Sequence, residues 1–117
     1  AFQIVDDILD IVGKQRTVGK SLGTDIEKAK LTLPMIHFLR EAAPEHRALL
    51  RGLLESRDSD RVERVRQLLA PSTSITYART TAQRYVDEAV AALQVLPPSP
   101  ARDLLQQMAV FITRREH

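Results

Sequence analysis

The first twelve residues, AFQIVDDILDIV, are apolar except for one narrow polar stripe. Its four members are Gln3, Asp6, Asp7 and Asp10, at the offsets i, i+3, i+4 and i+7. At about 100° per residue, this spacing places them on one side of a helix. Every other position is apolar, so the helix has no face suited to open water and we expect it to be buried. Buried carboxylates cost several kcal/mol each unless a partner or a metal neutralises them, and the stripe therefore predicts a polar cavity.

The oxygen-rich stripe favours a hard cation. Mg²⁺ prefers carboxylate oxygens, retains water ligands and bridges to substrate phosphates. The sequence argues against a calcium-binding loop, because no glycine turn with alternating oxygen ligands and a late Glu follows Asp10. A solvated acidic face is the usual alternative for an Asp-Asp-x-x-Asp run, and the apolar surroundings argue against it.

A glycine- and lysine-rich segment follows the stripe, at residues 13–31 (GKQRTVGKSLGTDIEKAKL). This composition predicts a flexible loop of the kind that carries binding groups. Lys20 and Lys30 are compact charges suited to phosphate, and the glycines let the backbone approach a ligand. Each lysine alone would equally serve solubility. Next to the carboxylates, the two lysines predict a diphosphate site.

The rest of the chain predicts helices separated by short breaks. We expect a helix that begins near Pro34 and a second one over 44–54. A third begins after a cap at Asp58 or Ser59 and stops at Pro71, a fourth spans 74–96, and a fifth begins at Ser99. No segment alternates with period two, so the predicted fold is all-α, with residues 1–117 in one domain. The predicted core includes Met35, Tyr77, Tyr85, Met108 and Phe111.

Composition excludes several classes of protein. The net charge of +2, with arginines scattered along the chain, does not indicate a nucleic-acid partner. The absence of cysteine rules out disulfides and thiolate metal sites and is consistent with a reducing cytoplasm, where we expect the protein. No apolar run reaches the length of a transmembrane helix, and no secretory signal is present.

The chain starts without Met, inside an apolar helical segment that has no capping residue before it. A natural domain rarely opens in this way. We therefore expect the chain to be the C-terminal piece of a longer protein.

Two stretches resemble a known family. FQIVDDILD followed by GKSLGTDIEKAKLTLP resembles the second aspartate-rich motif, and its following loop, of the trans-type polyprenyl diphosphate synthases. TYARTTAQRYVDEAVAALQVLPPSPARDLLQQMAVFITRRE resembles the C-terminal helices of their longer-chain bacterial members, such as octaprenyl diphosphate synthases. The similarity covers essentially the whole chain. It implies the C-terminal portion of a multi-helix bundle of the isoprenoid-synthase type.

The resemblance implies a prenyltransferase that joins an allylic diphosphate to isopentenyl diphosphate with the help of Mg²⁺. Asp6 would ligate a metal ion directly, while Asp7 and Asp10 would complete or orient its shell. Lys20 would share the catalytic role with Asp6. Other contacts to substrate would come from Lys30, on the allylic diphosphate, and from Gln3, near the reacting carbons.

Further roles follow from the same resemblance. Arg114 and Arg115 match a basic tail that closes near isopentenyl diphosphate, although two arginines also suit a helix C-terminus for electrostatic reasons alone. Asp25 would support the metal shell, orient a lysine or stabilise the loop. His37 lies outside the motif, and we expect it to be packed or exposed rather than catalytic. The family resemblance also implies a homodimer and release of a long product at a membrane surface.

The family pattern requires a first aspartate-rich motif and an upstream basic site, and this sequence contains neither. We therefore expect the full-length protein to be the enzyme and this chain alone to be inactive. One alternative is a non-catalytic helical subunit or interaction module derived from the family. A terpene cyclase of the same overall fold is a weaker alternative, because the loop after the stripe matches chain-elongating enzymes better.

Overall fold

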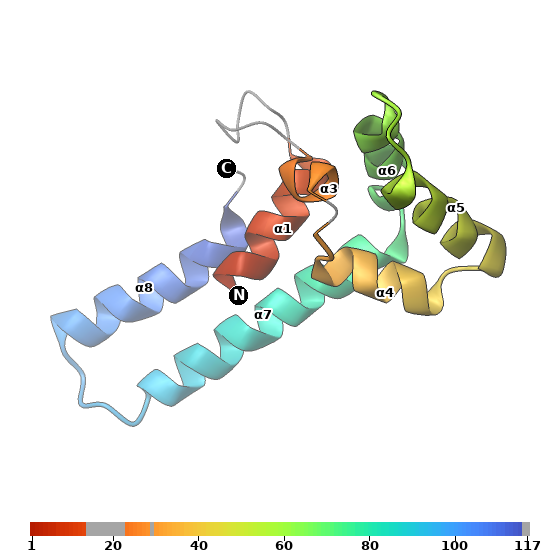
Figure 1. Ribbon diagram of the computed structural model, residues 1–117. Helices are drawn as coiled ribbons and strands as arrows, with labels where there is room; N and C mark the ends of the chain where they lie inside the picture. Colours follow the sequence, from red (N-terminus) through yellow and green to blue (C-terminus); the bar gives the residue numbers. More distant parts are fainter. Residues whose placement is uncertain (14–22, 29, 116–117) are drawn as a thin grey trace.

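The computed structural model describes residues 1–13, 23–28 and 30–115. These residues form helices and no strand, which confirms the predicted all-α class. The helices are α1 (Phe2–Val12), α3 (Thr24–Glu27), α4 (Leu33–Glu41), α5 (Pro44–Glu55), α6 (Arg61–Leu69), α7 (Thr73–Leu93) and α8 (Pro100–Arg114). Figure 1 shows α7 and α8 as a long antiparallel hairpin, with the other helices gathered around one end of it.

The main core lies where α1, α3, α4, α5, α6 and the first turns of α7 meet. Its buried members are Ile8, Ile11, Ile26, Met35, Phe38, Leu50, Leu53, Val65, Leu69, Ile75 and Ala78. Burying one such aliphatic side chain contributes about 1.5–3 kcal/mol. A smaller cluster of Val5, Leu9 and Ala82 joins α1 to the hairpin. The stripe helix is thus packed on two sides, against the core and against the hairpin.

Most helix boundaries agree with those predicted from the sequence. α1 ends before Gly13, and proline occupies the first turn of α4, α5 and α8. The hydroxyl of Ser99 accepts a hydrogen bond from the Arg102 backbone N–H at 3.1 Å, which caps α8. α6 differs slightly, because its N-cap is Asp60 rather than Asp58 or Ser59. α7 stops at Leu93, and tight turns rather than a further helical turn lead to Leu96.

The segment predicted as a loop contains one helical turn. Residues 24–27 form α3, so the prediction of a continuous loop over 13–31 is wrong there. The turn forms because the Asp10 carboxylate accepts backbone N–H groups at its start, a long-range contact that local sequence does not reveal. Gly23, just before it, has a φ of 78°, a conformation that glycine adopts without strain.

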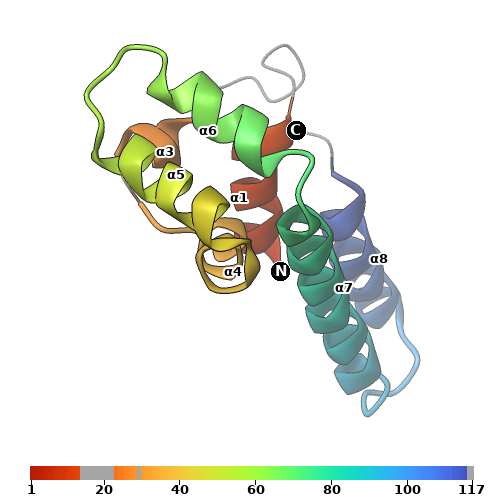
Figure 2. The same ribbon diagram turned by 90° about the vertical axis from the view of Figure 1, so that its right-hand side faces the viewer.

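The hairpin exposes several residues that the sequence placed in the core. Tyr77, Tyr85, Met108 and Phe111 are all largely exposed, and α8 buries none of its side chains fully. Figure 2 shows that the far ends of α7 and α8 extend beyond the other helices. Tyr77, in the first turns of α7, and Phe111, in the last turns of α8, lie at the opposite end of the hairpin and are exposed there as well. Met35 is fully buried, as predicted.

The stripe helix itself is not buried on every side. Phe2 is exposed, because it lies at the open start of α1, with the Arg115 guanidinium stacked on its ring at 4.0 Å. The expectation of complete burial thus fails at this end of α1. Among the helices of the described ranges, none combines the length and the apolar character needed to cross a bilayer.

Candidate metal and diphosphate site

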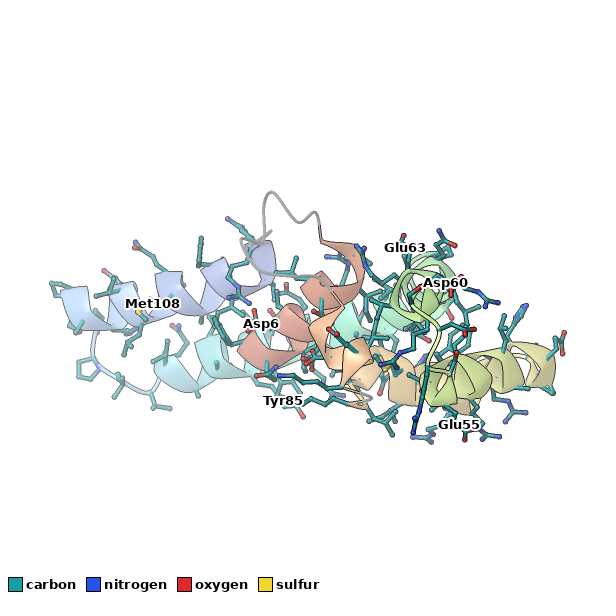
Figure 3. All side chains as sticks on the ribbon, turned by 45° about the horizontal axis from the view of Figure 1, so that its top comes forward. Asp6, Glu55, Asp60, Glu63, Tyr85 and Met108 are labelled. Carbon is teal, nitrogen blue, oxygen red and sulfur yellow. The ribbon has the colours of Figure 1, made fainter. Side chains whose placement is uncertain are left out.

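The three carboxylates of the stripe differ in their access to solvent. Asp10 is 1% exposed and Asp7 is 8% exposed, whereas the Asp6 side chain remains 29% exposed. Figure 3 shows Asp6 on α1, where this helix meets the hairpin. The solvent exposure of the stripe carboxylates therefore decreases from Asp6 to Asp10.

Asp10 holds the start of α3. Its two carboxylate oxygens accept the backbone N–H groups of Gly23 at 3.0 Å and Asp25 at 3.2 Å. Hydrogen bonds to an ionised acceptor are among the stronger ones in proteins. A Cβ at Gly23 would lie 2.2 Å from a methyl carbon of Val62, so the chain passes very close to α6 at this point. Asp10 thus fixes the position of Asp25 relative to α1.

The surroundings of Asp7 disfavour the ionised form of its carboxyl. Burial raises the pKa of its carboxyl above the ordinary value, and the negative charges of Asp25 and Asp6 raise this pKa further. Two groups oppose the rise in the pKa: Gln3, which donates to Asp7 at 2.9 Å, and the positive charge of Lys30. The fold therefore gathers around Asp7 the residues predicted from the sequence to act together.

Asp6 forms an ion pair with the last part of the described chain. The Arg115 Nη2 lies 2.5 Å from the Asp6 carboxylate. The Arg115 Nε is buried and has no hydrogen-bond partner among the described residues. The two predicted tail arginines thus differ, since Arg114 remains exposed while Arg115 reaches the stripe. This pairing joins residues 109 positions apart, which explains why no local pattern indicated it.

Two arginines that the sequence analysis overlooked also shape this region. Arg66 of α6 donates to the carbonyls of Ile11 at 2.9 Å and Gly13 at 3.1 Å, which caps the end of α1. Arg61 donates to the carbonyl of Glu27 at 2.7 Å and caps α3 in the same way. Their positions in sequence gave no signal, because both contacts cross to elements far away along the chain.

The donor chemistry of the stripe fits Mg²⁺. Within the part of the chain that the structure describes, no group of three or more His, Cys, Asp or Glu side chains is close enough to hold a metal ion alone. Mg²⁺ does not require one, since it is commonly held by one or two carboxylates together with substrate phosphates. Asp6 and Asp7 are consecutive in sequence, and Asp6 already pairs with a cation. Lys20, a predicted phosphate ligand, lies outside the described residues.

Comparison with known proteins connects this geometry with one family. The octaprenyl diphosphate synthase of Escherichia coli is 33% identical over 117 residues, which covers 99% of this chain and 36% of that protein. The chain therefore spans about a third of the length of the curated relatives it matches.

Solved structures agree with the sequence comparison. A geranylgeranyl pyrophosphate synthase from Corynebacterium glutamicum, complexed with calcium and isoprenyl diphosphate, is 38% identical with a TM-score of 0.84 and covers 98% of this chain and 36% of its own. A geranylgeranyl pyrophosphate synthetase from Pyrococcus horikoshii is 36% identical with a TM-score of 0.86 and covers 98% and 35%. The predicted likeness to the C-terminal part of such enzymes is thus confirmed.

The polyprenyl synthetase profile matches residues 1–71, the part that contains the stripe, α3 and the main-core helices up to the end of α6. The match includes more than half of the chain and every described member of the predicted metal and allylic-diphosphate set. The chain belongs to the polyprenyl synthetase family.

Proposed function

We propose that this chain is the C-terminal part of a prenyltransferase and supplies the half of its active site that receives Mg²⁺ and the allylic diphosphate. One observation carries the proposal: Asp6 and Asp7 are consecutive residues of α1, and Asp25 and Lys30 act electrostatically on Asp7. The family membership supports it, as does a relative whose structure contains calcium and isoprenyl diphosphate.

Each residue of the stripe has a distinct role in this proposal. Asp6 and Asp7 hold the metal, and Gln3 orients Asp7 through its hydrogen bond. Of the two roles predicted for Asp10, we assign it the orienting one, because its carboxylate already fixes α3 and with it Asp25. Magnesium, when bound, neutralises the charge that develops on the departing diphosphate.

The lysines act on the diphosphate itself. Lys30, and Lys20 by resemblance, bind its oxygens as point charges. The allylic C–O bond breaks, the double bond of isopentenyl diphosphate attacks the resulting carbocation, and a proton is then lost. The second diphosphate site lies, in this proposal, in the part of the protein that precedes this chain, and the whole enzyme acts as a homodimer.

A condensation assay on the full-length protein tests the proposal. With an allylic diphosphate and radiolabelled isopentenyl diphosphate, Asp6→Ala should lower kcat by at least about 10²–10³-fold, the usual effect of removing one electrostatic stabiliser of a transition state. Asp87→Ala is the matched control, since Asp87 is an exposed carboxylate on α7 that accepts a hydrogen bond from Gln83. Near-normal turnover of Asp6→Ala would contradict the assignment.

A second candidate function is a non-catalytic helical subunit or interaction module. The exposed apolar side chains of α8 favour it, because they suit contact with another protein surface. The same assay separates the two candidates. A full-length protein that binds partners but shows no condensation with any allylic substrate would support the module. By contrast, we expect this chain alone to show no turnover under either proposal.

A further inference from the structure

The ion pair between Arg115 and Asp6 points to a competition for one carboxylate. We propose that Arg115 is an exchangeable counter-ion of Asp6, which holds the carboxylate when metal is absent and leaves it when Mg²⁺ and diphosphate bind. This inference rests on the proposed function, because it takes Asp6 to be a metal ligand. It adds that the C-terminal end of α8 reports on the state of the metal site.

The geometry places both cations on the same group. Nη2 of Arg115 lies 2.5 Å from an Asp6 carboxylate oxygen. Mg²⁺ binds carboxylate oxygens at about 2.0–2.1 Å. A guanidinium kept in place would then lie within a few ångströms of a divalent cation, in a partly buried site where screening by solvent is weak. The two positive charges therefore exclude each other at Asp6.

The bound arginine is also incompletely satisfied. Its side chain is only 12% exposed, and its buried Nε–H has no acceptor within the part of the chain that the structure describes. A buried donor without a partner weakens the state that contains it. The stacking on Phe2 is a contact with an exposed ring, so it does not lock the guanidinium in place. Arg115 is thus held by one strong contact, the one that the metal would replace.

The structure provides room for Arg115 to move. The residue lines a cavity of about 290 Å³ between α1, α7 and α8, together with Gln83 and Thr113, which carry polar groups. Arg79 also lines this cavity and is exposed to solvent. A released Arg115 side chain can therefore leave the Asp6 carboxylate without displacing a packed core residue.

Competition at one site is reciprocal. If Arg115 must leave before Mg²⁺ binds, then its presence lowers the apparent affinity for Mg²⁺, and bound Mg²⁺ loosens the end of α8 by the same coupling free energy. Removing the arginine should tighten metal binding. A purely structural ion pair predicts the opposite, because its loss would disorder Asp6 and weaken binding.

Calorimetric titration of the full 117-residue chain with Mg²⁺ in the presence of inorganic pyrophosphate tests this prediction. We expect Arg115→Gln to lower the Kd for Mg²⁺ by about 5–50-fold, within the usual range of coupling between sites. Arg115→Lys keeps the charge without the planar fork and should give an intermediate Kd. Arg84→Gln removes an equal charge from the exposed face of α7 and should change the Kd less than twofold.

A structural readout accompanies the titration. The Arg115 Nε–H signal in ¹⁵N-edited NMR, assigned by its loss in Arg115→Gln, should shift when Mg²⁺ and pyrophosphate are added to the unmodified chain. Far-UV circular dichroism checks that each variant keeps its helices. An unchanged signal in the saturated chain would overturn the exchange.

The outcomes separate this inference from the proposed function. If Asp6→Asn abolishes Mg²⁺ binding while Arg115→Gln leaves the affinity unchanged or weaker, the exchange is wrong and the metal site stands. If Asp6→Asn binds Mg²⁺ as well as the unmodified chain does, or if none of the proteins binds it, the metal site is wrong and the exchange with it. Tighter binding in Arg115→Gln together with the NMR shift supports both.

Discussion

Around α1, the helices α3 to α6 and the first turns of α7 (Figure 1) bury most of their large apolar side chains among themselves. In the far half of α7 and along α8, by contrast, most large apolar side chains are partly or largely exposed, although Val86 is buried and Ile112 packs on the smaller cluster. The two regions have similar apolar patterns in sequence, with apolar residues three and four apart. What differs is the number of neighbours. A helix in the main core faces several others, while α8 packs on α7 and on one end of α1.

The comparison shows which features of a helix follow from its apolar face and which depend on the other helices. The apolar face determines which side of a helix faces a neighbour. It does not determine whether enough neighbouring helices exist to cover that side, and along α8 the described residues do not cover it. The candidate site lies at the junction, since α1 contacts the main core on one side and the hairpin on the other.

A matched pair of leucines should show the largest difference between the two regions. Leu50 on α5 is 0% exposed, and Leu104 on α8 is 57% exposed. Leu50→Ala should lower the free energy of unfolding by about 2–5 kcal/mol, because it leaves a cavity in a packed core. Leu104→Ala should change it by less than about 0.5 kcal/mol. Urea denaturation followed by circular dichroism measures both.

An equal loss in the free energy of unfolding at the two positions would contradict the difference between the packed core and the exposed α8. It would mean that α8 is covered in solution, for example by a second copy of the chain. Sedimentation velocity on the unmodified chain, over a range of concentrations, distinguishes that case from an error in the position of the helix.

Two glycines provide a second matched pair, both within the first region. Gly23→Ala should cost about 1–3 kcal/mol, because φ is 78° there and the new methyl group would meet Val62. Gly52 lies within α5 with nothing near its Cβ position, so Gly52→Ala should stabilise the fold by about 0.5–1 kcal/mol. Thermal unfolding of both variants measures the contrast. A harmless Gly23→Ala would show that the close approach of α6 to the segment before α3 is absent in solution.

The sequence predicted the helices better than it predicted their surroundings. Local signals placed the end of α1 and the starts of α4, α5 and α8 correctly, because a terminal glycine, prolines and the Ser99 cap act within a few residues. Exposure of Tyr85 and Met108 could not be predicted, since it depends on which helices lie opposite (Figure 3).

In the candidate site, too, some contacts could be predicted from the sequence and others could not. Asp25 lies close to the stripe because its backbone N–H donates to the Asp10 carboxylate, and both Asp25 and Lys30 act electrostatically on Asp7. The contacts of Arg66 with the end of α1 and of Arg115 with Asp6 could not be predicted from the sequence, since each contact joins distant parts of the chain. Metal ligation by Asp6, Asp7 and Asp10 and diphosphate binding by Lys20 remain predictions.

The cap of α8 allows a smaller test within the hairpin. α8 buries no side chain fully, so it depends more on local interactions than the core helices do. Ser99→Ala removes the hydrogen bond to the Arg102 N–H and should cost about 1 kcal/mol. Amide hydrogen exchange should then become about fivefold faster in α8 and stay unchanged in α4 and α5. Ser59→Ala, in an exposed turn, is the control.

Uniformly faster exchange after Ser99→Ala would contradict the division into two regions. It would show that α8 unfolds only together with the main core.

The smallest effect that we expect concerns Asp7 at the junction, and its sign depends on pH. Because burial raises the pKa of Asp7 in the folded chain, its ionisation opposes folding. At a pH below the unfolded-state pKa of about 4, the carboxyl is neutral in both states, and this contribution to stability is fully present. It is lost as the pH rises through the folded-state pKa. Asp7→Asn cannot ionise and keeps an acceptor for Gln3, so it should melt at a higher temperature than the unmodified chain at pH 7 and at a similar one near pH 3.5.

Thermal melts across this pH range, without metal, measure the difference, and Asp87→Asn on the exposed face of α7 should show no such trend. Mg²⁺ with pyrophosphate should reverse the order at pH 7, because ligand binding stabilises the unmodified chain and the neutral amide binds a hard cation less well. A lower melting temperature for Asp7→Asn at every pH would mean that the carboxylate stabilises the metal-free fold. Asp7 would then have a structural role where α1 contacts both regions. Its burial would no longer support the proposal that it binds a metal ion.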